Sequence, residues 1–110
     1  MSHIVVFVTV GNREEASHLA RVLVEERLAA CVNLLPSMAS TYWWRGQIEQ
    51  ADEVLLVMKT RQDLLEFLTA RVRTLHSYTV PEVIAVPIIG GNPDYLAWID
   101  ESVRREDQGG

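Results

Sequence analysis

Apolar residues along the chain form two kinds of pattern, and their succession predicts the fold. Residues 4–10 (IVVFVTV) are mostly β-branched and end at Gly11, so they predict a strand with apolar side chains on both faces. Residues 54–58 (VLLVM) form a second run of this kind. Because a strand that is apolar on both faces belongs inside a sheet, the two runs predict two inner strands.

Helical spacing of apolar residues follows each inner strand. Asn12 with Glu15 is an Asn version of the capping box, and alanines and leucines then recur every three or four residues. This pattern predicts a first helix that runs to about Ala29. Thr60 with Asp63 repeats the capping spacing and predicts the start of a second helix.

The second helix is expected to stop near His76, because Pro81 pushes the residue before it out of helical geometry and the chain runs extended up to it. Residues 83–89 predict a fourth strand, which closes at two glycines. Asn92 as the cap and Pro93 at the first helical position predict a third helix.

The segment between the first two helices predicts a long hairpin. Residues 31–44 are extended in character, and Arg45-Gly46 offers a turn before the second apolar run. The resulting order of strand, helix, strand, strand, helix, strand predicts a split β-α-β arrangement, an α+β fold with the first and third strands inside. Pro36 and Pro87 fall in the two edge strands, where the missing N–H of proline is tolerated.

Such a sheet leaves one apolar face without cover. Two helices can cover only one face, yet both inner strands carry apolar side chains on both faces. The hairpin strand is also long, roughly 45 Å if fully extended, and it carries Tyr42, Trp43 and Trp44. One alternative is that the third helix folds across the open face. We expect other copies of the chain to cover it, so the protein is predicted to self-associate.

Composition narrows the class of protein. The chain has 110 residues, 48% of them hydrophobic, which predicts one domain over residues 1–110. Ten basic and fifteen acidic residues give a net charge of −5, so nucleic acid is not an expected partner. No run reaches the roughly 20 apolar residues of a membrane span, so no membrane association is expected.

Cys31 and the C-terminal tail add two smaller expectations. Cys31 is the only cysteine, and its apolar neighbours predict a small buried hydrophobe. One cysteine cannot form an intrachain disulfide, which suits a reducing compartment, and we expect a cytoplasmic protein. The polar tail, residues 104–110, is expected to fray.

Four separated blocks of the sequence carry a family resemblance. The blocks are ERLAACVNLLP at residues 26–36, Tyr-x-Trp-x-Gly-x-Ile at 42–48, Glu-x-x-x-x-x-Lys-Thr at 53–60, and His-x-Tyr-x-x-Pro-Glu-x-x-Ala-x-Pro-Ile at 76–88. With these blocks in this order, the chain resembles the CutA family of divalent-cation tolerance proteins. The resemblance implies a ferredoxin-like fold assembled as a homotrimer through long hairpins, similar in architecture to the PII signalling trimers. It also implies copper and other divalent cations as ligands.

This chain departs from the family at one set of positions. Some members with a proposed copper site have a cysteine near the end of the first strand and a His-His pair after the second helix. Here those positions hold Val8 and Leu75-His76, so only His76 remains. Soft thiolate and paired imidazoles are the ligands that favour copper, and the copper-selective set is therefore incomplete in this chain.

Polar and aromatic residues are expected to gather around a cleft between subunits. Alternation puts Tyr42 and Trp44 on one face of the hairpin strand, and Trp43, on the other face, is expected to pack against the protein. The predicted cleft residues are Tyr42, Trp44, Lys59, His76, Tyr78 and Glu82, and the predicted metal ligands are His76 and Glu82.

Two of these residues also have a structural interpretation. His76 at the end of the second helix is placed either to bind a metal or to cap the helix, whose dipole favours a cation there. Lys59 ends an inner strand among apolar neighbours, so its ammonium needs water or a carboxylate, and Glu82 is the expected partner.

The leading functional hypothesis is a homotrimer that binds divalent metal ions, copper above others, and contributes to metal tolerance. A second is a PII-like sensor in which an anionic metabolite enters the cleft and Lys59 supplies charge. A third is a stable trimeric scaffold for partner proteins. Enzyme activity is not expected, because the sequence has no nucleophile motif, no glycine-rich phosphate loop and no metal quartet.

Overall fold

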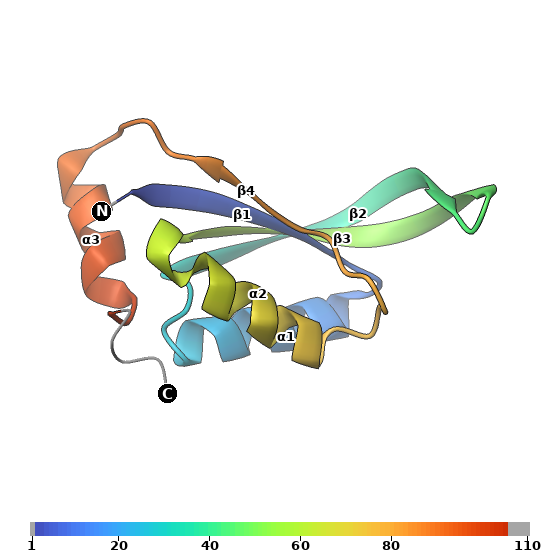
Figure 1. The fold of residues 1–110 in the computed structure, drawn as a ribbon, viewed down its shortest axis with the longest axis horizontal. Helices are drawn as coiled ribbons and strands as arrows, with labels where there is room; N and C mark the ends of the chain where they lie inside the picture. The colour runs from blue at the N-terminus through green and yellow to red at the C-terminus, as the bar shows by residue number, and fades with distance from the viewer. Residues whose placement is uncertain (1, 106–110) are drawn as a thin grey trace.

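The computed structural model describes residues 2–105 and has a mixed α+β fold. The elements are β1 (His3–Val10), α1 (Arg13–Glu25), β2 (Cys31–Trp44), β3 (Gln47–Arg61), a 3-10 turn (Gln62–Leu64), α2 (Leu65–Leu75), β4 (Val83–Pro87) and α3 (Pro93–Ser102). The strands form one antiparallel sheet in the order β2-β3-β1-β4, so β1 and β3 are the inner strands as predicted. Helices α1 and α2 lie side by side against the sheet, and α3 lies at one end of it (Figure 1).

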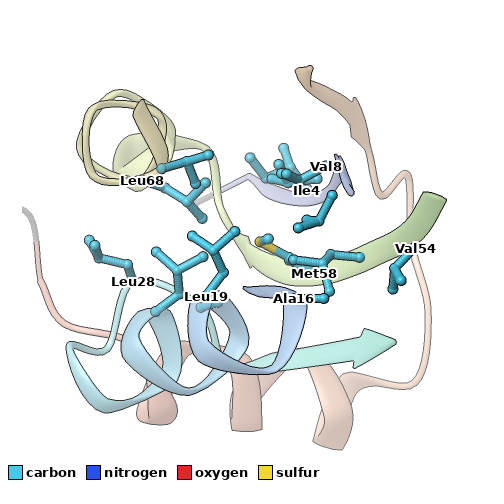
Figure 2. Packing of buried hydrophobic residues seen from close by; sticks show 14 residues of the cluster. Ile4, Val8, Ala16, Leu19, Leu28, Val54, Met58 and Leu68 are labelled. Carbon is cyan, nitrogen blue, oxygen red and sulfur yellow. The ribbon is translucent and has the colours of Figure 1, made fainter. Parts of the chain in front are cut away.

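The core lies between the sheet and the helix pair α1 and α2 (Figure 2). Side chains of β1 alternate between buried and half-buried, and the buried set faces the helices. Burial of each large apolar side chain contributes about 1.5–3 kcal/mol. The sheet residues of this core include Ile4, Val6, Val8, Val10, Val54, Leu56 and Met58, and the helix residues include Ala16, Leu19, Leu23, Leu68 and Val72.

The opposite face of the sheet is largely open in a single chain. Leu35, Ile84 and Val86 are 46%, 55% and 45% exposed, although all three lie on strands. Helix α3 reaches only one end of this face, where Tyr95 meets Cys31. The third helix therefore does not cover the whole face, and an apolar surface remains available for association.

Helix α1 begins as predicted and ends earlier. The side chain of Asn12 accepts a hydrogen bond from the backbone N–H of Glu15 at 2.8 Å, which confirms the cap. The helix ends at Glu25 because Arg27 takes a left-handed conformation, with φ of 58°, and Leu28 turns back to bond a helix carbonyl. This is a Schellman-type ending in which arginine takes the place usually held by glycine.

The predicted cap of α2 is wrong. Thr60 lies within β3, and its hydroxyl donates to the carbonyl of Leu28 at 2.7 Å instead of capping a helix. Asp63 pairs with Arg61 at 3.0 Å. A 3-10 turn comes between β3 and α2, and no side chain within residues 2–105 caps the helix. The end of α2 agrees with the prediction, because His76 is its C-terminal cap.

The C-terminal third follows the predicted pattern with two differences. Asn92 caps α3, since its side chain accepts from the N–H of Asp94 at 3.0 Å. Strand β4 stops at Pro87 and not at residue 89. Arg104, placed in the fraying tail, is held by a hydrogen bond from its N–H to the carbonyl of Arg27 at 2.8 Å. Residues 106–110 of that tail lie outside the described residues.

The β2–β3 hairpin is long, as predicted, and extends beyond the helices (Figure 1). It gives the molecule an elongated outline of 43 × 30 × 24 Å. Pairing shifts between Leu35 and Met38, so Pro36 falls at an irregularity that needs no N–H donor. The tip is a two-residue turn with positive φ at Arg45 and Gly46, the geometry that suits the twist of a hairpin.

Candidate functional site

A cleft of about 840 Å³ lies where the hairpin leaves the sheet. One wall comes from the hairpin, and the other comes from the loop between α2 and β4. The lining residues are Thr9, Met38, Ser40, Thr41, Tyr42, Trp43, Trp44, Glu53, Leu55, Ser77, Tyr78, Thr79, Val80 and Glu82. Four of the six predicted cleft residues, Tyr42, Trp44, Tyr78 and Glu82, are among them, whereas Lys59 and His76 are not.

Tyr78 and Glu53 join the two walls of this cleft. The hydroxyl of Tyr78 donates to Oε2 of Glu53 at 2.9 Å, and Glu53 is only 7% exposed. Burial and the Glu53 carboxylate raise the pKa of Tyr78 to about 12, so the hydroxyl keeps its proton at neutral pH. The ring of Tyr78 also fills the space above Gly11, where an added Cβ would lie 3.1 Å from the hydroxyl oxygen.

His76 sits behind the cleft wall with both ring nitrogens in use. Nε2 lies 2.7 Å from the carbonyl oxygen of Thr9, and Nδ1 accepts from the backbone N–H of Tyr78 at 3.0 Å. A neutral imidazole with its proton on Nε2 satisfies both contacts. The side chain has no exposed surface. This arrangement makes His76 a structural link between α2, β1 and the loop that carries Tyr78.

Glu15 holds the same loop from the side of α1. Its carboxylate accepts from the backbone N–H of Ser77 at 2.9 Å and from the Ser77 hydroxyl at 2.8 Å, and it lies 3.5 Å from Nδ1 of His76. Burial opposes the charged form of Glu15, but these contacts outweigh it and lower the pKa of the carboxyl group. Sequence reasoning assigned no role to Glu15 beyond helix capping.

Lys59 lies elsewhere on the sheet. Strand pairing places Lys59 opposite Val5 on β1 and opposite Cys31 on β2, toward the end of the sheet near α3. Its ammonium donates to the side-chain oxygen of Asn33 and lies 4.0 Å from the Cys31 sulfur. The expected pairing with Glu82 is therefore wrong, because sheet register separates the two residues. Cys31 is half-buried, which is less enclosed than predicted.

The hairpin aromatic residues are open in a single chain. Tyr42 and Trp44 are each 41% exposed, and Trp43 is 72% exposed. The expectation that Trp43 packs against the protein is wrong within one chain. All three residues line the cleft.

No metal site forms within residues 2–105: no group of three or more His, Cys, Asp or Glu side chains is placed to hold a metal ion. The two predicted ligands are not brought together, since His76 is buried and Glu82 is exposed in the cleft wall.

The sequence analysis did not single out Glu53 as a cleft residue. Its signal was alternation, which puts Glu53 on the same face of β3 as Leu55, toward the cleft.

Comparison with known proteins identifies the family to which the sequence is similar. Residues 4–102 match the sequence model of the family described as CutA1 divalent ion tolerance protein. Protein CutA 1, chloroplastic, of Oryza sativa subsp. japonica is 52% identical over 92% of this chain, and the chain spans 57% of that protein. Divalent-cation tolerance protein CutA of Thermus thermophilus is 48% identical over 89% of this chain and 95% of its own length.

Solved structures agree with the family match. The crystal structure of CutA1 from Oryza sativa superposes with a TM-score of 0.92 at 50% identity, and covers 94% of this chain and 95% of its own. Cut A1 from Thermus thermophilus gives a TM-score of 0.91 at 46% identity, over 93% of this chain and 99% of its own. The predicted resemblance and the ferredoxin-like fold are thereby confirmed.

Several of these relatives are named for divalent-cation tolerance, and the names refer to more than one compartment. One is chloroplastic, and a CutA structure from Archaeoglobus fulgidus is described as periplasmic. Among the helices in the described residues, none is long and apolar enough to cross a bilayer. The sequence match from residue 4 to residue 102, the sheet order and the long hairpin lead to one conclusion: this chain belongs to the CutA1 family of divalent ion tolerance proteins.

Proposed function

We propose that this chain works in the cytoplasm as a homotrimer that binds divalent metal ions, copper above others, and contributes to tolerance of them. The observation that carries the proposal is the family match over residues 4–102, together with relatives named for divalent-cation tolerance at about half identity. The fold adds a reason for assembly. The sheet face that carries Leu35, Ile84 and Val86 is apolar and open, and other copies of the chain would cover it.

The proposed metal site lies between copies. Within the described part of one chain, no three donor side chains converge, whereas divalent ions need several ligands at once. A ligand set drawn from two or three copies removes this difficulty. Glu82 is our proposed ligand because its carboxylate is exposed in the cleft wall. His76 would have to give up its contacts with Thr9 and Tyr78 to bind a metal, so we assign it to positioning the loop.

Calorimetric titration of the full chain with copper, zinc and cobalt tests this function. We expect saturable binding, with copper tightest, and a loss of roughly 10-fold in affinity for Glu82→Gln, since one charged ligand is removed. Glu49→Gln removes a carboxylate from the same hairpin outside the cleft lining, and it should bind as the wild type does. Dissociation constants weaker than about 1 mM for every ion would contradict the proposal.

An anionic metabolite is a poor fit to the cleft. Among the residues that the structure describes, the lining contains Glu53 and Glu82 and no lysine, arginine or histidine. Lys59, which was expected to supply the positive charge, is bonded to Asn33 away from the cleft. The electrostatics of the cleft therefore oppose an anion.

A further inference from the structure

The chain after α3 returns to the end of α1, on the side of the sheet that the helices cover (Figure 1). The backbone N–H of Arg104 donates to the carbonyl of Arg27 at 2.8 Å, and Nη1 of Arg27 donates to the carbonyl of Ser102 at 3.0 Å. The hairpin extends from the opposite end of the molecule (Figure 1). An assembly through the open sheet face and the hairpin therefore leaves this region accessible.

Arginine side chains gather around this segment. Nε and Nη2 of Arg71 on α2 donate to the carboxylate of Glu26 at 2.9 and 2.8 Å. The guanidinium carbon of Arg104 lies 5.3 Å from the ring centre of Phe67, also on α2, in a cation–π contact. The hydrogen bond from Arg71 and the charges of Arg71 and Arg104 lower the pKa of Glu26, although desolvation opposes this. Arg71 and Arg104 therefore both act on one carboxylate.

Positive charge exceeds negative charge at this end of the helix pair. Arg27, Arg71 and Arg104 supply three positive charges around the carboxylate of Glu26, whereas the whole chain has a net charge of −5. Arg27 is exposed, and the side chains of Arg71 and Glu26 are 37% and 38% exposed. A local positive excess on an acidic protein attracts anions to one place on its surface.

Arg104 provides a second observation. Its Nε is buried, and among the residues that the structure describes it has no hydrogen-bond partner. A buried donor without an acceptor is unfavourable, so this guanidinium gains more from an incoming anion than a fully bonded arginine does. Its stacking on Phe67 and its backbone bond to Arg27 hold it in place before a ligand arrives.

We propose that Arg27, Arg71 and Arg104 form a binding site for a small anion that carries two or more phosphate groups. Guanidinium groups bind phosphate oxygens through two parallel N–H donors, a geometry that an ammonium group does not match. All three cations of the site are arginines. The ligand would share Arg71 with Glu26, and it would pair with donors of Arg27 and Arg104 that Glu26 does not use.

The size of the site favours a small ligand. An extended polyanion such as RNA needs positive charge along its length, whereas this chain has fifteen acidic and ten basic residues. Its negative surface would repel the parts of a long polyanion that lie beyond the three arginines. None of these arginines lines the cleft, so the proposal is independent of the divalent-metal function.

Calorimetric titration with inorganic triphosphate tests the site. The full chain is first dialysed free of divalent ions, so that no metal can bridge the phosphates to the cleft carboxylates. We expect a dissociation constant below about 100 µM at low salt, and binding at least about 10-fold tighter than that of sulfate, because triphosphate contacts several guanidinium groups at once. The affinity should fall as the salt concentration rises.

Variants locate the site. Arg104→Gln and Arg27→Gln should each weaken triphosphate binding at least about fivefold, and circular dichroism checks that both proteins fold. Glu26→Gln should strengthen binding about twofold to fivefold, because it removes the competing carboxylate. Arg13→Gln and Glu14→Gln make the same charge changes at the other end of α1, about 20 Å away by helix length, and should leave binding within about twofold.

Several results would overturn the proposal. Undetectable binding at about 1 mM triphosphate, or equal affinity for sulfate, would exclude a site for several phosphate groups. Equal losses in Arg104→Gln and Arg13→Gln would mean that binding responds only to the overall charge of the protein. Unchanged or weaker binding in Glu26→Gln would place the anion away from Arg71. Tighter binding of a long RNA than of triphosphate, at equal phosphate concentration, would indicate a nucleic-acid surface instead.

Discussion

Individual polar residues hold the cleft in shape through contacts between distant parts of the chain. Glu15 on α1 bonds both the backbone and the hydroxyl of Ser77, and His76 bridges from the end of α2 to Thr9 on β1. These bonds fix the segment that carries Tyr78. A charged acceptor makes the Glu15 bonds stronger than neutral ones, which is why this carboxylate has a lowered pKa despite partial burial.

Glu15→Gln should lower the free energy of unfolding by about 1–2 kcal/mol at pH 7. Because the folded-state pKa of Glu15 is below its ordinary value of 4.5, the stabilisation is present above about pH 4.5 and is lost as pH falls through the folded-state pKa. Urea unfolding of both proteins at pH 7 and about pH 3 measures this difference. Glu14→Gln, in the same helical turn but exposed, should cost under about 0.5 kcal/mol. An equal cost of Glu15→Gln at both pH values would contradict the assignment.

Residue roles could be predicted where the partner is near in sequence. The caps Asn12 and Asn92 bond backbone N–H groups two or three residues away, and both were predicted. The cap assigned to Thr60 failed because its hydroxyl bonds Leu28, 32 residues away. Short-range spacing shows which hydrogen bonds a side chain can make to residues near it in sequence. Folding can bring a distant residue close enough to accept the hydrogen bond instead.

At the scale of elements, the β2–β3 hairpin sets the position of the aromatic residues. Its tip needs positive φ at two successive residues, which is costly for any side chain with a Cβ and least costly for glycine. Arg45 accepts the conformation with φ of 51°, and Gly46 has φ of 80°. The hairpin register, and with it the faces of Tyr42 and Trp44, depends on this turn.

Gly46→Ala should destabilise the protein by about 1 kcal/mol, because alanine resists the left-handed conformation. Gly90→Ala is a matched control, since both glycines have open space around them and only Gly46 has positive φ. The control should be neutral or slightly stabilising. Thermal unfolding measures the global effect, and hydrogen exchange at Trp44 measures loosening at the tip. Equal effects of the two substitutions would show that the turn conformation carries no cost.

At the scale of the whole molecule, the two faces of the sheet differ. One face of the sheet is covered by α1 and α2, and the other carries exposed apolar side chains on β2 and β4. Helix α3 occupies one end only (Figure 1). Since each uncovered large apolar side chain forgoes about 1.5–3 kcal/mol of burial, association with further copies is the expected outcome.

Light scattering on the full chain should give three times the chain mass of 12.4 kDa. Ile84→Glu, in the open face, should shift the protein toward the single-chain mass at micromolar concentration, because it places a charge in the interface. Val24→Glu is the control, since Val24 is 41% exposed on the helix side of the molecule. A wild-type chain that stays at its single-chain mass would refute the assembly and the shared metal site with it.

The amino-acid pattern by itself determined the order of elements, the inner strands, the helix caps at Asn12 and Asn92 and the long hairpin. These features depend on the spacing of apolar and polar residues over short segments of the chain, and that spacing can be seen in the sequence itself. Alternation predicted that Tyr42 and Trp44 share one face of the hairpin strand, but Trp43 lines the cleft as well, so alternation alone did not select the cleft residues. The resemblance to the CutA family could also be seen in the sequence, because short segments of the chain carry it.

Only the tertiary structure decided which distant polar groups meet. Sheet register carries Lys59 to Asn33 and away from Glu82, and it brings Glu53 to Tyr78. Burial then determines what each group can do: His76 is enclosed with both nitrogens bonded, whereas Glu53 is enclosed and accepts a hydrogen bond from the Tyr78 hydroxyl. Partner choice depends on three-dimensional proximity and on the cost of leaving a polar group unpaired, and neither is encoded in local spacing.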